Sequence, residues 1–150
     1  PMAMLPFCGY NMADYWSHWI STGDREGVNL PRIYYVNWFR KNKAGKFMWP
    51  GFGENSRVLK WVFERCEGTA DAIETPIGNL PTLDAMDFDG LDLDDDSIAE
   101  LLKVEVDGWL EEIPLIEEYY AQFGDRMPAE LNEELSSLKS KLEAAKQTAA

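Results

Sequence analysis

The chain has 150 residues, of which 45% are hydrophobic, 27% charged and 13% aromatic, a composition typical of one globular domain rather than a disordered segment. Its apolar runs are too short to span a bilayer, and no charged and apolar leader follows Pro1, so we expect no membrane partner and a cytoplasmic location with two free thiols. The formal net charge of −13 disfavours nucleic acid as a partner.

The charge is distributed unevenly along the chain. Residues 1–68 contain nine Lys or Arg and six Asp or Glu, whereas residues 84–118 contain fourteen Asp or Glu and one lysine. We interpret the acidic stretch as a solubilising surface. The basic residues gather around one aromatic segment, which suits a small anionic ligand better than a long polyanion. They are Arg40, Lys41, Lys43, Lys46, Arg57 and Lys60.

The first third of the chain predicts a helix followed by a β-hairpin. Asn11 is a suitable N-cap for a helix with an apolar face over the next ten residues. Residues 32–39, RIYYVNWF, are β-branched and aromatic, which predicts a buried strand. A turn at Gly45 would then pair this strand with a second one over residues 46–49.

A second helix and an irregular connection follow. We expect Asn55 or Ser56 to cap a helix that ends at Gly68. Residues 75–93 are interrupted by prolines and glycines, which predicts an extended connection. We place the organisational boundary of the chain there, near residue 81.

The remainder of the chain predicts amphipathic helices. Ser97 and Glu100 have the spacing of a capping box, and Pro114 indicates a helix start or a kink. The last helix has one narrow apolar stripe, which indicates packing against the body of the protein. Its leucines are Leu131, Leu135, Leu138 and Leu142.

The segment KFMWPGFGENSR, residues 46–57, is the main candidate for a binding site. Its glycines allow a ligand to approach the backbone closely, and its rings, together with the nearby Phe39, could present flat faces to a planar heterocycle. Asn55 has an amide donor and an acceptor, either of which matches a purine edge. Composition alone favours the alternative that the rings only cover a hairpin core. The residues concerned are Phe39, Phe47, Phe52, Gly51 and Gly53.

Other site patterns are weak. The segment DLDDDS, residues 92–97, begins like a calcium loop, but Ser97 replaces the required glycine and Lys103 the final glutamate. No Walker-type or dinucleotide-binding glycine pattern is present. His18 has no partners at metal spacing, and Cys8 has no clear activating environment.

Three stretches resemble the C-terminal part of a GTP-dependent phosphoenolpyruvate carboxykinase. They are PFCGYNMADYWSHW from residue 6, LPRIYYVNWFRKNKAGKFMWPGFGENSRVLKW from residue 30 and TPIGNLP from residue 75. The resemblance covers essentially the whole chain and is weakest in the acidic tail. It implies a parent enzyme of two-lobed α/β fold that converts oxaloacetate and GTP to phosphoenolpyruvate, GDP and CO2 in gluconeogenesis, with Mn2+ or Mg2+.

The resemblance also implies roles for individual residues. Three phenylalanines would surround the guanine ring and an asparagine would contact its edge, whereas another phenylalanine would lie near phosphoenolpyruvate. It implies no catalytic residue and no metal ligand in this chain, because the family's phosphate loop, reactive cysteine and metal ligands lie upstream. The nucleotide residues would be Phe39, Phe47, Phe52, Gly53, Glu54 and Asn55, and the last phenylalanine Phe7.

We therefore expect an α+β portion, mostly helical with one β-hairpin, of a longer α/β enzyme. Residues 1–81 would belong to the nucleotide-binding lobe and contain the guanine-binding loop, and residues 82–150 would form an acidic helical tail that packs on it. Its partners would be guanine nucleotide and the N-terminal remainder of the enzyme, without which the chain would be inactive. The alternative is a non-enzymatic acidic helical interaction module with an aromatic core.

Overall fold

The computed structural model describes residues 4–149, which form two compact units. The first unit combines the two ends of the sequence, within Pro1–Pro31 and Glu105–Ala150. The second unit is continuous and spans Arg32–Val104. Within the described residues, no helix is both long and apolar enough to cross a bilayer.

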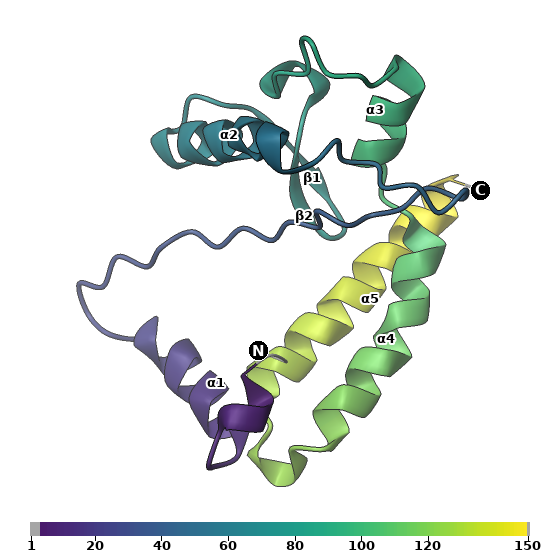
Figure 1. The fold of residues 1–150 in the computed structure, drawn as a ribbon. Helices are drawn as coiled ribbons and strands as arrows, with labels where there is room; N and C mark the ends of the chain where they lie inside the picture. Colours follow the sequence, from purple (N-terminus) through teal and green to yellow (C-terminus); the bar gives the residue numbers. More distant parts are fainter. Residues whose placement is uncertain (1–3, 150) are drawn as a thin grey trace. The chain divides into compact units, whose positions relative to one another are not determined.

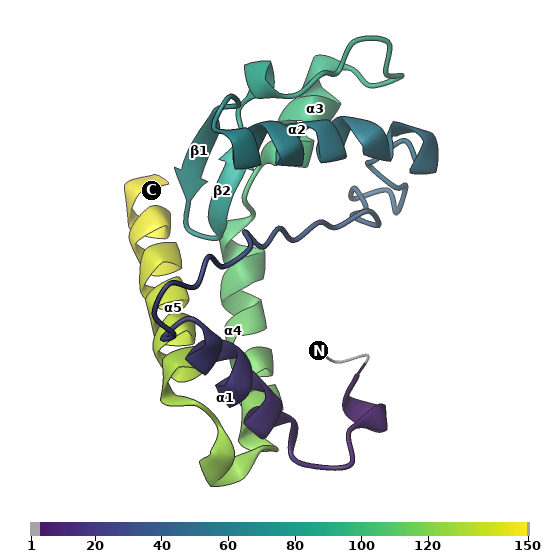
Figure 2. The ribbon, with the colours of Figure 1, turned by 90° about the vertical axis from the view of Figure 1, so that its left-hand side faces the viewer.

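The first unit is helical. Two long helices, α4 and α5, lie side by side in both views (Figures 1 and 2). Asn11 caps the shorter helix α1, because its side-chain oxygen accepts a hydrogen bond from the Ala13 N–H at 2.9 Å. This confirms the predicted cap. The elements are η1 (Leu5–Phe7), α1 (Met12–Thr22), α4 (Val106–Ala121), η4 (Gly124–Arg126) and α5 (Ala129–Ala149).

Aromatic side chains form the core of the first unit. Met12, Ala13 and Phe123 are buried together, and the Trp16 ring meets the Phe123 ring edge to face at a centroid separation of 4.6 Å. The backbone of this core is also fixed, since the Asn11 side-chain amide donates a hydrogen bond to the carbonyl of Phe123 at 3.1 Å. The rings therefore stabilise the contact between α1 and the end of α4.

Helix α5 packs against α4 through its leucine stripe. Leu135 and Leu142 are buried, as the predicted amphipathic pattern requires. Helix α4 continues through Pro114 without ending there. An ion pair of 2.7 Å between Lys146 and Asp107 joins the far ends of the two helices.

The second unit is built around helix α2. This helix ends at Gly68, whose φ of 78° is a left-handed conformation that glycine adopts without a Cβ clash. Trp61 is the buried residue of α2, and its indole N–H donates to the carbonyl of Asp71 at 3.1 Å. The elements are η2 (Phe52–Glu54), α2 (Asn55–Glu67), β1 (Ala72–Thr75), β2 (Gly78–Pro81), η3 (Leu83–Ala85) and α3 (Asp95–Leu102).

The described structure is mostly helical with one antiparallel hairpin, which confirms the α+β description, but the hairpin lies elsewhere than predicted. It pairs β1 with β2, with Ala72 opposite Pro81 and Thr75 opposite Gly78. The end of β1, the turn and all of β2 lie within residues 75–93, the segment expected to be an irregular connection. The short turn at residues 76–77 allows the strands to pair, and the Thr75 hydroxyl donates to the carbonyl of Gly78 at 2.6 Å.

The predicted pairing of residues 32–39 with 46–49 is wrong. Residues 32–37 form no regular element, and only an isolated bridge joins Lys41 to Phe47. Side-chain pattern indicates strand propensity, but a strand also needs a partner for its backbone groups. Here the turn is closed instead by Asn42, whose side-chain oxygen accepts from the N–H groups of Ala44 and Lys46 at 3.0 Å.

The start of α3 also differs from the prediction. Ser97 lies inside the helix, and Asp94 is the N-cap, accepting a hydrogen bond from the Ser97 N–H at 2.8 Å. The sequence has three adjacent aspartates, Asp94 to Asp96, each of which is a suitable N-cap. The first of the three, Asp94, occupies the N-cap position. The side chain and the backbone N–H of Ser97 both donate to this carboxylate and lower the pKa of Asp94.

Candidate functional site

The aromatic residues of the candidate loop divide into buried anchors and exposed rings. Met48 and Trp49 are buried in the second unit. By contrast, Phe39, Phe47 and Phe52 are 74%, 52% and 91% exposed. Buried rings would have meant that the loop only covers a core. The observed exposure leaves three aromatic faces open to a ligand.

Two of the exposed rings lie together. The Phe39 and Phe47 ring centroids are 6.0 Å apart at an interplanar angle of 63°. The Lys41 ammonium lies 5.0 Å from the centroid of the Phe47 ring, within cation–π range. The backbone between the rings is held by the Asn42 turn and by a hydrogen bond of 2.9 Å from the Met48 N–H to the Arg40 carbonyl. The pair is therefore presented by a closed turn.

Arg40 fastens this turn to the end of α3. Its guanidinium donates to the carbonyls of Leu101 and Lys103 at 2.9 and 3.1 Å. These carbonyls belong to the last turn of the helix, where backbone acceptors lack partners within the helix. In the sequence, Arg40 is only one of several positive charges near the loop. In the structure it is a positional anchor.

Phe52 begins η2 immediately before α2. Gly51 precedes it with a φ of 131°, a conformation that side chains rarely adopt. The next residue but one, Glu54, accepts a hydrogen bond of 2.6 Å from Arg57, which raises the pKa of the Arg57 guanidinium. Arg57 also donates to the backbone carbonyl and the carboxylate of Asp87 at 3.0 and 3.1 Å. These contacts brace the backbone beneath the Phe52 ring.

Asn55 is the first residue of α2 but does not cap it. The N-cap is Glu54, without a side-chain cap bond, so the predicted cap at Asn55 or Ser56 is wrong. The Asn55 side-chain oxygen is engaged elsewhere: it accepts a hydrogen bond of 2.9 Å from the indole N–H of Trp49. A buried tryptophan needs an acceptor for this N–H, and that requirement is the only sequence signal for the contact.

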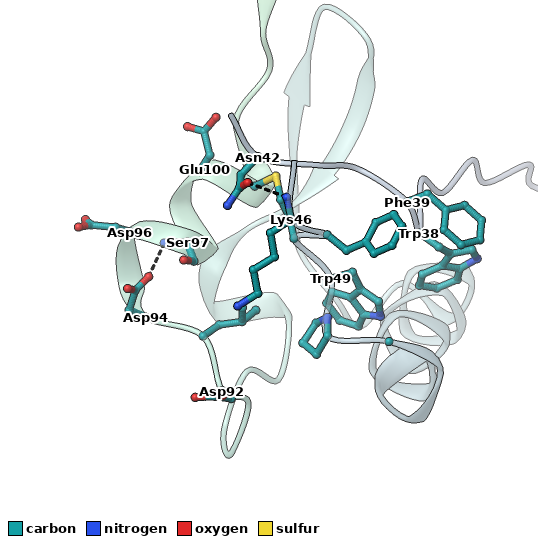
Figure 3. A pocket seen from close by; sticks show the side chains of 15 residues that line it. Trp38, Phe39, Asn42, Lys46, Trp49, Asp92, Asp94, Asp96, Ser97 and Glu100 are labelled. Carbon is teal, nitrogen blue, oxygen red and sulfur yellow. Dashed lines mark hydrogen bonds between the residues drawn. The ribbon is translucent and has the colours of Figure 1, made fainter. Parts of the chain in front are cut away.

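A pocket of about 800 Å³ lies beside the exposed ring pair. Its volume is within the usual range for small-molecule sites. Figure 3 shows aromatic side chains on one side of it and carboxylates on the other. Lys46 also lines the pocket. The aromatic side includes Trp38, Phe39, Phe47 and Trp49, and the acidic side Asp92, Asp94, Asp96 and Glu100.

The remaining predicted residues lie as follows. Gly53 is in η2, next to Phe52. Phe7 ends η1 in the first unit, and its ring is exposed. Cys8 is half-buried, with its sulfur 3.1 Å from the Met12 sulfur, and His18 is exposed on α1. Among residues 4–149, no three His, Cys, Asp or Glu side chains are grouped as a metal site would require.

Comparison with known proteins gives consistent matches. Residues 1–141 match the family model of the phosphoenolpyruvate carboxykinase C-terminal P-loop domain. The chain is 49% identical over 144 residues to phosphoenolpyruvate carboxykinase (GTP) of Treponema pallidum (strain Nichols), covering 95% of this chain and 23% of that protein. It is 50% identical over 143 residues to the Chlamydia pneumoniae enzyme of the same name, covering 95% and 24%.

A third relative, phosphoenolpyruvate carboxykinase (GTP) of Arthrobacter sp. (strain FB24), is 52% identical over 143 residues, covering 95% of this chain and 23% of the relative. The chain thus spans about a quarter of the length of the curated relatives it matches. The similarity extends over nearly all of the sequence, including the candidate loop.

Proposed function

The chain belongs to the family of the phosphoenolpyruvate carboxykinase C-terminal P-loop domain, and from this premise we propose that it is the guanine-nucleotide-binding portion of a GTP-dependent enzyme. The complete enzyme would convert oxaloacetate and GTP to phosphoenolpyruvate, GDP and CO2. This chain would bind and orient the base, and phosphoryl transfer would use groups from the rest of the enzyme. The parent would have two lobes of α/β structure.

The observation that supports this function best is the exposure of the three phenylalanines. Phe39 and Phe47 line a pocket of suitable size. Phe52, at the start of η2 directly before α2, is almost fully exposed. Stacking on an aromatic side chain contributes roughly 1–3 kcal/mol per base. An interaction module with an aromatic core would instead bury these rings, so that alternative is not favoured.

Charge suggests how the nucleotide would lie. The carboxylates on one side of the pocket would repel phosphates, whereas the Lys41 ammonium lies over the Phe47 ring and Lys46 lines the same pocket. The base would therefore enter toward the rings, with its phosphates directed away from the carboxylates. Glu54 would contribute through its backbone, because its carboxylate is bonded to Arg57. Residues 1–81 would supply all of the nucleotide contacts, and residues 82–150 the tail that packs on them.

Mn2+ or Mg2+, which the enzyme family implies, does not fit the described residues. No group of three suitable side chains exists among residues 4–149. The ligands would therefore lie in the rest of the enzyme. The same reasoning predicts that the 150-residue chain alone has no activity. Phe7 would contribute to the phosphoenolpyruvate site in the complete protein.

Phe47→Ala in the full-length enzyme that contains this chain tests the base site. The KM for GTP should rise about 5- to 140-fold, equivalent to a stacking loss of roughly 1–3 kcal/mol. The KM for oxaloacetate should not change, since the ring contacts only the base. Phe63→Ala is the matched control, because Phe63 is an exposed ring of α2 that does not line the pocket. An unchanged KM for GTP in Phe47→Ala would refute the proposal.

A further inference from the structure

We propose that Trp49 is a positioning residue for base selectivity, which acts by holding the acceptor oxygen of Asn55 so that only hydrogen-bond donors face the base. The inference rests on the proposed guanine site and specifies how that site distinguishes purines. From the sequence alone, either half of the Asn55 amide matches a purine edge. The contact of 2.9 Å between the Trp49 indole nitrogen and the Asn55 side-chain oxygen separates the two halves.

The orientation of the Asn55 amide follows from chemistry. An indole N–H is a donor only, and the amide nitrogen is likewise a donor. If the amide of Asn55 were rotated by half a turn, its NH2 group would face the N–H of Trp49 without an acceptor between them. Trp49 is only 6% exposed, so its N–H would then be buried without a hydrogen-bond partner, which is unfavourable. The oxygen must therefore face Trp49.

Both partners are fixed by their surroundings. The Trp49 ring packs against Trp38 at a centroid separation of 6.2 Å. Asn55 is held at the start of α2, where the neighbouring Glu54 is tied to Arg57. The hydrogen bond joins residues six positions apart and so closes the segment that contains Gly51 and Phe52. The same contact that orients the amide also limits the movement of the Phe52 backbone.

The consequence for a bound purine concerns the group at carbon 6. With its oxygen held by Trp49, Asn55 presents the two N–H bonds of its amide. Guanine has an acceptor, O6, at that edge, whereas adenine has an amino donor there. The Asn55 amide would donate a hydrogen bond to O6 of guanine. Opposite adenine, two donors would face each other without an acceptor. A site that hydrogen-bonds its ligand rejects an analogue that leaves the buried polar groups unpaired.

The test compares GTP with 2-aminoadenosine triphosphate, which keeps the 2-amino group of guanine and replaces the 6-carbonyl by an amine. In the full-length enzyme, the wild type should prefer GTP in kcat/KM. Trp49→Phe removes the N–H and keeps a ring, so Asn55 becomes free to rotate. The preference for GTP should then fall about 3- to 10-fold, the equivalent of one hydrogen bond.

Trp61→Phe is the matched control. Trp61 has the same 6% exposure and its indole also donates one hydrogen bond, but to the Asp71 carbonyl outside the pocket. Trp61→Phe should therefore destabilise the protein about as much as Trp49→Phe does, without a change in the preference between the two nucleotides. A preference that is unchanged in Trp49→Phe, or reduced equally in Trp61→Phe, would overturn the role of Trp49.

Asn55→Asp decides the matter if Trp49→Phe does not fold. An aspartate still accepts from Trp49 but presents only an acceptor to the base. The preference should then shift from GTP toward the 6-amino nucleotide, and retention of the wild-type preference would overturn the proposal. If wild type itself does not prefer GTP, and Phe47→Ala does not alter the KM, the proposed function fails. If the wild type prefers GTP and Phe47→Ala raises the KM for GTP, but Trp49→Phe and Asn55→Asp keep the wild-type preference, the proposed function stands and this inference fails.

Discussion

The first unit and the candidate loop of the second unit use aromatic side chains in opposite ways. In the first unit, Trp16 and Phe123 meet at 4.6 Å and enclose the buried Met12. In the loop, Phe39 and Phe47 also touch, at 6.0 Å, yet both rings remain mostly exposed. Ring contact alone therefore does not identify a core.

The difference arises from what lies behind the rings. In the first unit, Phe123 follows α4 and is buried against Met12 and Ala13 of α1, and the half-buried Trp16 packs on this cluster. The loop places only Met48 and Trp49 toward the interior, and these two side chains anchor it. The exposed phenylalanines of the loop, Phe39, Phe47 and Phe52, contribute little to the stability of the unit. Such exposed apolar surface in a fixed geometry is typical of a binding site.

The largest expected effect is on the core. Phe123→Ala should lower the free energy of unfolding by about 3–5 kcal/mol, because it removes a buried ring and leaves a cavity. The thermal midpoint of the full-length enzyme measures this loss. Leu115→Ala, at an exposed position of α4, is the control and should change it little. A small effect of Phe123→Ala would mean that the cluster is not a core, and the comparison would fail.

Phe52→Ala should give the complementary result. Its ring is 91% exposed, so stability should change by less than about 0.5 kcal/mol. Binding of GDP should weaken by roughly 1–3 kcal/mol if the ring stacks on the base. Isothermal titration calorimetry of the full-length enzyme measures the second quantity. A variant that is strongly destabilised but binds normally would place Phe52 with the core residues instead.

The smallest effect concerns pH and the acidic side of the pocket. Hydrogen bonds from Ser97 lower the pKa of Asp94 in the folded state. The ionised carboxylate therefore stabilises α3 fully at pH values above the ordinary aspartate pKa of about 3.9. That stabilisation is lost as the pH falls through the lowered, folded-state pKa. The amide signal of Ser97 in NMR spectra should therefore titrate below 3.9 in the wild type. Asp94→Asn keeps an acceptor but does not ionise, so the titration should vanish; its persistence would assign the signal to another group.

The helices could largely be predicted because their signals are local. Asn11 caps α1 through the N–H of Ala13, and Gly68 ends α2, as the sequence indicates. Caps and apolar stripes involve residues at most a few positions apart, so few tertiary contacts can override them. The predicted cap of α3 at Ser97 is wrong although its signal is also local, because several adjacent polar residues are suitable N-caps and the structure uses Asp94.

The hairpin could not be placed in the same way. Residues 32–39 have more strand character than residues 72–81, yet only the latter form a ladder. Strand pairing depends on whether a second segment meets the first in register, and a single segment does not contain that information. The candidate site gives a related example: the sequence pattern predicts Asn55 as a helix cap, but the Asn55 side-chain oxygen accepts a hydrogen bond from the indole N–H of Trp49.

The sequence by itself determined the chemical types at the candidate site: three phenylalanine rings, flexible glycines and an amide beside a helix start. It also determined family membership, because these residues stand in a long and specific order. Only the tertiary structure decided which rings face outward and which half of the Asn55 amide is available. The physical reason is that burial and hydrogen-bond pairing depend on the three-dimensional neighbours of a side chain, and Trp49 becomes such a neighbour of Asn55 only when the loop folds.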